Sequence, residues 1–286
     1  MTVNVTRHGG PGPDDEAYAQ TLWKGLARTI ASLHDRPRNF GLALNNSLSC
    51  VQAWLAVNPD GSQLETWEAV TTAMQVHSAA FAAACATEGT GEYRINHELH
   101  AIPATGPQYY ANAGNWLTAF WFAVVCRDQA RMTQLCEIPL DVLRASGAEG
   151  DEYVHHWVDA LQTYWLERPG LAEKLTLAIQ TSHPDVATIA PRDLLQNILY
   201  QPINLFHRFL VKDHEAFNQA LLEAVQAHKA YWTATAKREG SVEGYLALGP
   251  LAIACLAHDA GFEIDIETPY LPGELLRRAW LGEFPT

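Results

Sequence analysis

The chain has 286 residues, 48% of them hydrophobic, and its 32 acidic and 19 basic residues give a formal net charge of −13. This apolar content is enough for a packed core and excludes an intrinsically disordered chain. The excess of acid repels phosphate backbones and anionic lipid headgroups, so we expect no nucleic acid and no membrane as a partner. The charge is compatible with a basic protein partner and equally with simple solubility.

The cysteines and the start of the chain indicate a cytoplasmic protein. The five cysteines are an odd number without a CxxC pair, and most lie in apolar helical runs, as buried free thiols in a reducing compartment do. Residues 1–13 contain no basic region followed by an apolar stretch, so we expect no secretory signal. The most apolar stretch, residues 116–126, is too short to span a bilayer.

Residues 1–13 are rich in glycine and proline and predict a turn-rich segment ahead of a single helical domain over 14–286. Asp14 or Asp15 can cap a first helix that runs to about residue 33. A second helix is predicted over 40–57. A third follows to residue 85, and we expect Ser62 and Glu65 to form a capping box at its start.

Two short segments alternate apolar and polar residues and predict extended structure near 92–100 and 262–267. In the first, the alternating positions are Tyr93, Ile95, His97 and Leu99. We expect one short strand or an extended stretch there, not a helix.

Helical spacing fills the remainder of the chain, and the glycine-rich acidic loop at 147–151 is a possible internal boundary. We expect Pro202 to kink one helix and Asp213 to cap the next. The fold class is therefore all-α, an array of about ten helices in antiparallel hairpins, either a bundle or solenoid-like. The predicted helices of this part lie at 109–127, 128–137, 139–146, from 151 onward, 171–182, 191–210, from 213 onward, 242–260 and 272–280.

One motif suggests an enzyme. Arg7-His8-Gly9 follows an alternating segment, as at the start of histidine phosphatases, and His258-Asp259 resembles a partner motif of that family. The comparison is weak, because that fold needs an α/β sheet, His258 lies in an apolar helical run and a further phosphate-binding arginine is missing. A histidine-phosphatase-like hydrolase using His8 is the enzymatic alternative.

No other pattern carries chemistry. The two histidines of His97-Glu98-Leu99-His100 are three apart, whereas a helical zinc protease needs them four apart. His155 and His156 are adjacent on a predicted helix and point in different directions. A glycine-rich nucleotide loop is also missing. We therefore predict no catalytic, cofactor-binding or metal-binding residues.

Five segments together resemble the immunity protein 49 family of bacterial polymorphic toxin systems, over roughly residues 60–283. The resemblance implies a protein that binds and neutralises a toxin encoded nearby, with no catalytic residues. The segments are Ile102-Pro103-Ala104-Thr105-Gly106-Pro107, Asn115-Trp116-Leu117-Thr118-Ala119-Phe120, Cys126-Arg127-Asp128, Leu246-Ala247-Leu248-Gly249-Pro250-Leu251 and Tyr270-Leu271-Pro272.

Several of these matched residues have structural roles by their chemistry. Arg127 is expected at a helix end, where it can meet exposed carbonyls, and Asp128 can start the next helix. Gly249-Pro250 is expected to mark a helix break or kink.

Acid-rich loops are the natural contacts for a basic toxin, with a solvated surface as the alternative reading. A helical scaffold or regulator with some other partner is a further alternative to the immunity function. The predicted partner-binding residues form two groups: Glu149, Asp151 and Glu152, and Glu263, Asp265 and Glu267.

Overall fold

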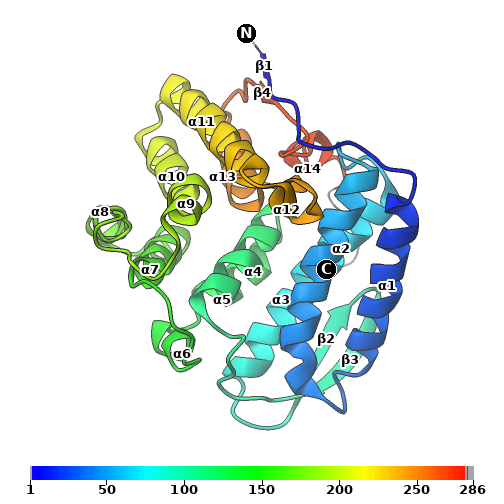
Figure 1. Cartoon of the computed structure of the whole chain (residues 1–286). Helices are drawn as coiled ribbons and strands as arrows, with labels where there is room; N and C mark the ends of the chain where they lie inside the picture. Colours follow the sequence, from blue (N-terminus) through cyan, green and yellow to red (C-terminus); the bar gives the residue numbers. More distant parts are fainter. Residues whose placement is uncertain (1, 281, 283–286) are drawn as a thin grey trace.

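Three long helices and a hairpin form most of the N-terminal third of the protein (Figure 1). The computed structural model describes residues 2–280 and 282, so the end of the predicted domain at 283–286 lies outside the described residues. The helices α1 (Asp15–Ala31), α2 (Phe40–Val57) and α3 (Leu64–Cys85) pack consecutively, and β2 (Thr90–Ile95) pairs with β3 (Glu98–Pro103). The second helix has the predicted bounds.

Helices α4 (Ala113–Val125) and α13 (Leu248–Asp259) pack against each other at the centre (Figure 1). Both are strongly apolar, and Trp116 and Phe120 of α4 are fully buried and stacked. The predicted helix 242–260 is thus central, but it is divided. A 3-10 turn, η3 (Val242–Tyr245), precedes α13, and Gly249 and Pro250 lie in the first turn of α13, where proline is tolerated.

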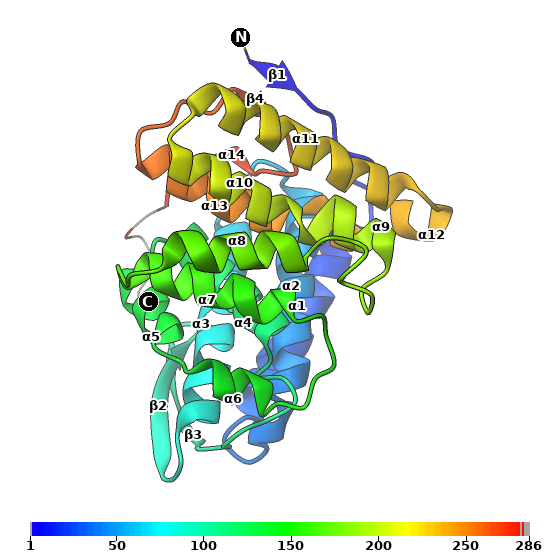
Figure 2. The ribbon, with the colours of Figure 1, turned by 90° about the vertical axis from the view of Figure 1, so that its left-hand side faces the viewer.

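Most of the other helices cover the opposite side of this central pair (Figure 2). Helix α7 packs against α8, and α10 packs against α11. One continuous apolar core joins residues on both sides of the loop at 147–151. The elements are α5 (Gln129–Cys136), α6 (Leu140–Arg144), α7 (Tyr153–Trp165), α8 (Leu171–Thr181), α9 (Arg192–Leu194), η2 (Leu195–Leu199), α10 (Gln201–Val211), α11 (His214–Thr233), α12 (Ala236–Glu239) and α14 (Gly273–Leu276).

The all-α class is confirmed, and the helices surround a central pair as a bundle (Figures 1 and 2). None of the described helices is both long and apolar enough to cross a membrane. The predicted extended segment near 262–267 contains β4 (Ile266–Glu267). It pairs in parallel with β1 (Val3–Asn4), which lies inside the predicted N-terminal segment.

The extended structure predicted near 92–100 is confirmed, but the expectation of a single strand was wrong, because the segment is a two-stranded hairpin. Asn96 and His97 have φ angles of 49° and 68° and form the two-residue turn between the strands. Tight hairpin turns need positive φ at both central residues, and asparagine adopts it more readily than most residues. The turn reverses the chain in the middle of the alternating pattern.

The predicted capping box was also wrong. Helix α3 begins at Leu64, and neither Ser62 nor Glu65 caps it. Instead, the side-chain oxygen of Asn58 accepts from the amide of Gln63 at 2.8 Å. The turn before the helix therefore supplies the acceptor for the amide of Gln63, the residue that precedes α3.

The expected kink near Pro202 takes the form of a π-helical turn. The residues of η2 precede α10, and the amide of Tyr200 donates to the carbonyl of Leu195 at 2.9 Å, five residues back. Proline lacks an amide hydrogen, so the helix cannot continue its regular bonding through this position.

Gly249 allows α13 to approach α10 closely. A Cβ atom there would lie 2.6 Å from Cγ of Pro202 and 3.6 Å from Nε1 of Trp121. We expect Gly249→Ala to lower the free energy of unfolding by about 1–3 kcal/mol, because the proline ring cannot move aside freely. Gly25 of α1 has open space around it, so the control Gly25→Ala should instead add about 0.5–1 kcal/mol. Urea unfolding of the two variants tests this; equal effects would contradict it.

Candidate partner-binding site

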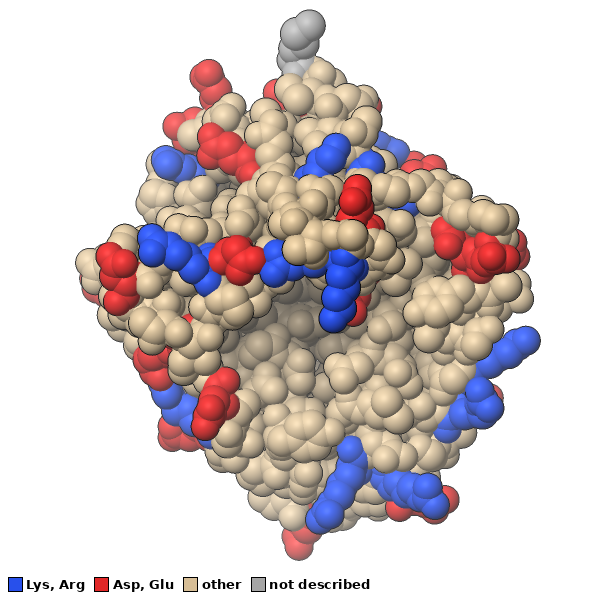
Figure 3. Space-filling view, in the orientation of Figure 1, with Lys and Arg blue, Asp and Glu red and all other residues tan. Residues whose placement is uncertain are grey.

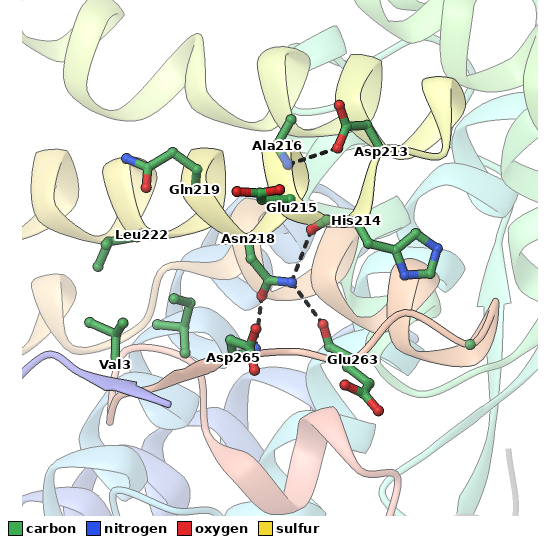
Figure 4. Close-up of a pocket in the computed structure, with 12 residues that line it drawn as sticks. Val3, Asp213, His214, Glu215, Ala216, Asn218, Gln219, Leu222, Glu263 and Asp265 are labelled. Carbon is green, nitrogen blue, oxygen red and sulfur yellow. Dashed lines mark hydrogen bonds between the residues drawn. The ribbon is translucent and has the colours of Figure 1, made fainter. Parts of the chain in front are cut away.

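An acidic groove lies between the first turns of α11 and the segment that leads into β4 (Figure 4). Its volume is about 890 Å³, and Val3 of β1 closes one end. Four carboxylates line it, those of Asp213, Glu215, Glu263 and Asp265, and none of the lysines and arginines that the structure describes does. We call this the acidic groove.

Asn218 of α11 holds the two walls of the acidic groove together (Figure 4). Its Nδ2 donates to the carbonyl of Glu263 at 2.8 Å, and its Oδ1 accepts from the amide of Asp265 at 2.8 Å. The amide of Val3 donates to the carbonyl of Asp265 at 2.7 Å. The backbone that carries the two acids is thus fixed by tertiary contacts, and their side chains remain free to face solvent.

The four carboxylates of the acidic groove differ in their partners. Asp213 caps α11, as predicted, by accepting from the amide of Ala216 at 3.0 Å. Within the part of the chain that the structure describes, Glu215, Glu263 and Asp265 form no ion pair. Unpaired like charges close together favour a cationic partner.

Glu267, the third predicted acid of this segment, lies beside the groove. It lines a neighbouring cavity of about 690 Å³ together with Asp60 and Arg277. The structure therefore brings Glu263 and Asp265 together and adds two acids from α11. Reasoning from the sequence missed Asp213 and Glu215 as neighbours of this segment, because about 50 residues separate them and no local pattern signals the contact.

A second hollow, the central groove, lies in the middle of the face shown in Figure 3, and its floor is mostly uncharged. Its volume is about 510 Å³. It is lined by parts of α2, α4, α7, η2 and α11, by the loop 149–151 and by residues 243–250. The apolar lining includes Leu117, Trp121, Val154, Trp157, Ile198 and Leu248.

The other group of predicted acids lies at or near the central groove but serves different purposes. Glu149 is exposed and lines the groove. Asp151 also lines it, yet its side chain is only 7% exposed. Glu152 is exposed and pairs with Arg144, with Nη1 and Oε2 at 3.0 Å.

Asp151 anchors the loop 188–190. Its two carboxylate oxygens accept from the amides of Thr188, Ile189 and Ala190 at 2.7, 2.9 and 2.8 Å. Burial opposes ionisation of this carboxyl, but the three amide hydrogen bonds outweigh it and hold the pKa of Asp151 below its ordinary value. The carboxylate thereby fixes Ile189, which is 59% exposed, at the wall of the central groove.

We expect Asp151→Asn to lower the free energy of unfolding by about 1–3 kcal/mol at neutral pH, because one charged acceptor is lost. The folded-state pKa is lowered, so this stabilisation is present above the unfolded pKa of about 3.9 and is lost as the pH falls through the folded value. The difference in the free energy of unfolding between the wild type and the variant should therefore become smaller below about pH 4. The control Glu152→Gln should cost less than about 1 kcal/mol. Urea unfolding at several pH values measures both variants. A stability difference between the wild type and Asp151→Asn that does not change with pH would contradict the role assigned to the Asp151 carboxylate.

The Arg7-His8-Gly9 motif attaches the N-terminal segment to the body of the protein. His8 is buried, and its Nδ1 lies 2.6 Å from the hydroxyl of Tyr270. Burial and then the charge of Arg7 lower the pKa of His8. The Arg7 guanidinium donates to the carbonyl of Leu55 at 2.7 Å and lies 3.9 Å from the ring centroid of Tyr245.

His258, the partner that a phosphatase reading requires, belongs to another cluster. Its Nδ1 lies 3.3 Å from Asp259, which is paired with Arg127. Both motifs of the enzymatic alternative are therefore engaged in separate structural contacts. Among the described residues, no three histidine, cysteine or carboxylate side chains are grouped to hold a metal ion.

The fold and the two grooves define a helical protein that presents unpaired acids around hollows. The family model described as Immunity protein 49 matches residues 58–275, and the chain belongs to this family. No curated protein and no solved structure gives a significant match. Two of the segments that carry the family resemblance, 115–120 and 246–251, supply lining residues to the central groove.

Proposed function

We propose that this protein protects a bacterial cell by binding and neutralising a toxin of a polymorphic toxin system in the cytoplasm. The observation that carries the proposal is the family match over residues 58–275. The protein would act by occupying the toxin surface in a stoichiometric complex, without a chemical step.

Charge supports a basic toxin surface as the target. The net charge of −13 creates a long-range attraction for a positively charged domain, and the acidic groove concentrates unpaired carboxylates at one place. Such complementarity raises the association rate and selects against acidic partners. The predicted residues Glu149, Glu152, Glu263, Asp265 and Glu267 remain candidate contacts, whereas Asp151 would act by fixing the loop 188–190.

The test is co-expression with the protein encoded by the adjacent gene. Expression of that protein alone should arrest growth, co-expression should restore it, and the purified pair should co-elute as one complex. A toxin from an unrelated system serves as the specificity control and should remain toxic. Growth arrest that persists on co-expression, together with separate elution, would overturn the proposal.

A further inference from the structure

The central groove has the dimensions and composition of a preformed binding pocket. Its volume of about 510 Å³ falls within the range of ligand pockets and exceeds the volume of one large side chain. Its floor is closely packed, because a Cβ atom on Gly249 would lie only 2.6 Å from Cγ of Pro202 and 3.6 Å from Nε1 of Trp121. Asp151 fixes the wall that carries Ile189. An inserted group would therefore meet little reorganisation cost.

The charged side chains that line the central groove are acidic within the described part of the chain. Glu149 and Glu243 are exposed, come from different elements, and line the groove, while no lysine or arginine among the described residues lines it. Neither carboxylate forms an ion pair within the described ranges 2–280 and 282. Basic side chains are visible above the hollow (Figure 3). Arg238 of α12 is already paired with Asp193 at 2.8 Å.

We propose that the central groove receives an aromatic or long aliphatic side chain of the toxin, flanked by a lysine or arginine that pairs with Glu149 and Glu243. This inference rests on the proposed function and names the anchor within the complex. Buried apolar or aromatic anchors in pockets commonly dominate such interfaces. Helix α11 lines both grooves, the acidic groove with residues near its start and the central groove with Ala224, His228 and Trp232.

Thr118 offers a way to fill the groove without disturbing the fold. It is half-buried on α4 and lines the groove, and its hydroxyl donates to the carbonyl of Gly114 at 3.3 Å. Thr118→Phe would occupy the hollow. Thr176→Phe on α8 is the matched control, because Thr176 makes the same bond to Ala172 but is exposed and does not line the groove.

The first measurement needs no toxin. Tryptamine and indole-3-acetate share one ring and carry opposite charges, and their binding to the full chain can be followed by saturation-transfer NMR. We expect tryptamine to bind at least about tenfold more tightly, in keeping with the acidic lining. Thr118→Phe should abolish this binding, the double variant Glu149→Gln with Glu243→Gln should remove the preference, and Thr176→Phe should change nothing. Equal binding of the two probes, no binding, or tryptamine binding that survives Thr118→Phe would overturn the proposal that the central groove is a binding pocket.

The second measurement uses the protein encoded by the adjacent gene. Thr118→Phe should weaken the complex by about 100-fold or more, as loss of a central anchor does, while Thr176→Phe should leave it unchanged. A complex of unchanged affinity with Thr118→Phe would overturn the anchor but leave the proposed function standing. If the wild type forms no complex, the proposed function fails, and the anchor fails with it. Circular dichroism establishes that each variant is folded.

Discussion

Replacing Arg127 with alanine should lower the free energy of unfolding by about 3–5 kcal/mol, because three backbone carbonyls and the carboxylate of Asp259 would lose a charged hydrogen-bond donor. The Arg127 side chain is 8% exposed, and its Nε donates to Asp259 at 3.0 Å. Its Nη1 donates to the carbonyls of Val125 and Leu275 at 2.8 and 2.9 Å, and its Nη2 donates to that of Leu276 at 2.7 Å. One side chain thus joins the ends of α4, α13 and α14.

The backbone of Arg127 allows a sharper test. Its φ of 55° lies in the left-handed region, and its amide and that of Asp128 donate back to Val124 and Ala123, closing α4. Glycine is the usual residue there, so Arg127→Gly should be about 1 kcal/mol less destabilised than Arg127→Ala. The control Arg144→Ala removes an exposed arginine–carboxylate pair and should cost less than about 1 kcal/mol.

Chemical unfolding followed by fluorescence measures all three variants. If Arg127→Ala cost no more than Arg144→Ala, the cluster at Arg127 would not hold the helix ends together. If the glycine variant were the less stable of the two Arg127 variants, the backbone strain assigned to this position would be wrong.

Reversing the charge of the acidic groove should weaken toxin binding by about 100-fold or more, with a large share of the loss in the association rate. The triple variant changes Glu215, Glu263 and Asp265 to lysine and leaves Asp213 in place as the cap of α11. None of these three carboxylates is paired within the described part of the chain, so their replacement leaves no buried charge behind. The fold should therefore be retained.

The hairpin provides a matched control for net charge. Glu92 of β2, Glu98 of β3 and the nearby Glu88 are exposed, and both strands lie at the end of the molecule away from β4 (Figure 1). Their replacement by lysine changes the net charge equally. Surface plasmon resonance at low and high salt should show a strong, salt-sensitive loss for the groove variant and a small one for the hairpin variant. Equal losses would mean that overall charge, and not the groove, attracts the toxin.

Local chemistry was sufficient to predict most helices. The helix over 40–57, the cap at Asp213 and the roles of Arg127 and Asp128 at a helix junction were all predicted correctly. These features depend on residues within one or two turns of each other, since helical periodicity and caps are local. The capping box at Ser62 failed because Asp60, in the preceding turn, accepts from both the amide and the hydroxyl of Ser62.

The composition of the two grooves depends on contacts between residues that are far apart in the sequence. Nothing in the sequence around Asp151 indicates that its carboxylate would bind amides 37 to 39 residues away. The same holds for Glu215 beside Glu263, and for Glu149 and Glu243 around one hollow. A single sequence records which residues can carry charge, but the packing of helices determines which of those residues meet.

The sequence by itself determined an acidic, all-α protein with the pattern of an immunity family, because composition and helical periodicity are properties of the chain alone. Only the tertiary structure decided where the acids gather, which of them is buried and where a hollow remains. Grooves form where helices distant in the chain fail to fill the space between them, and that depends on side-chain packing across the whole bundle.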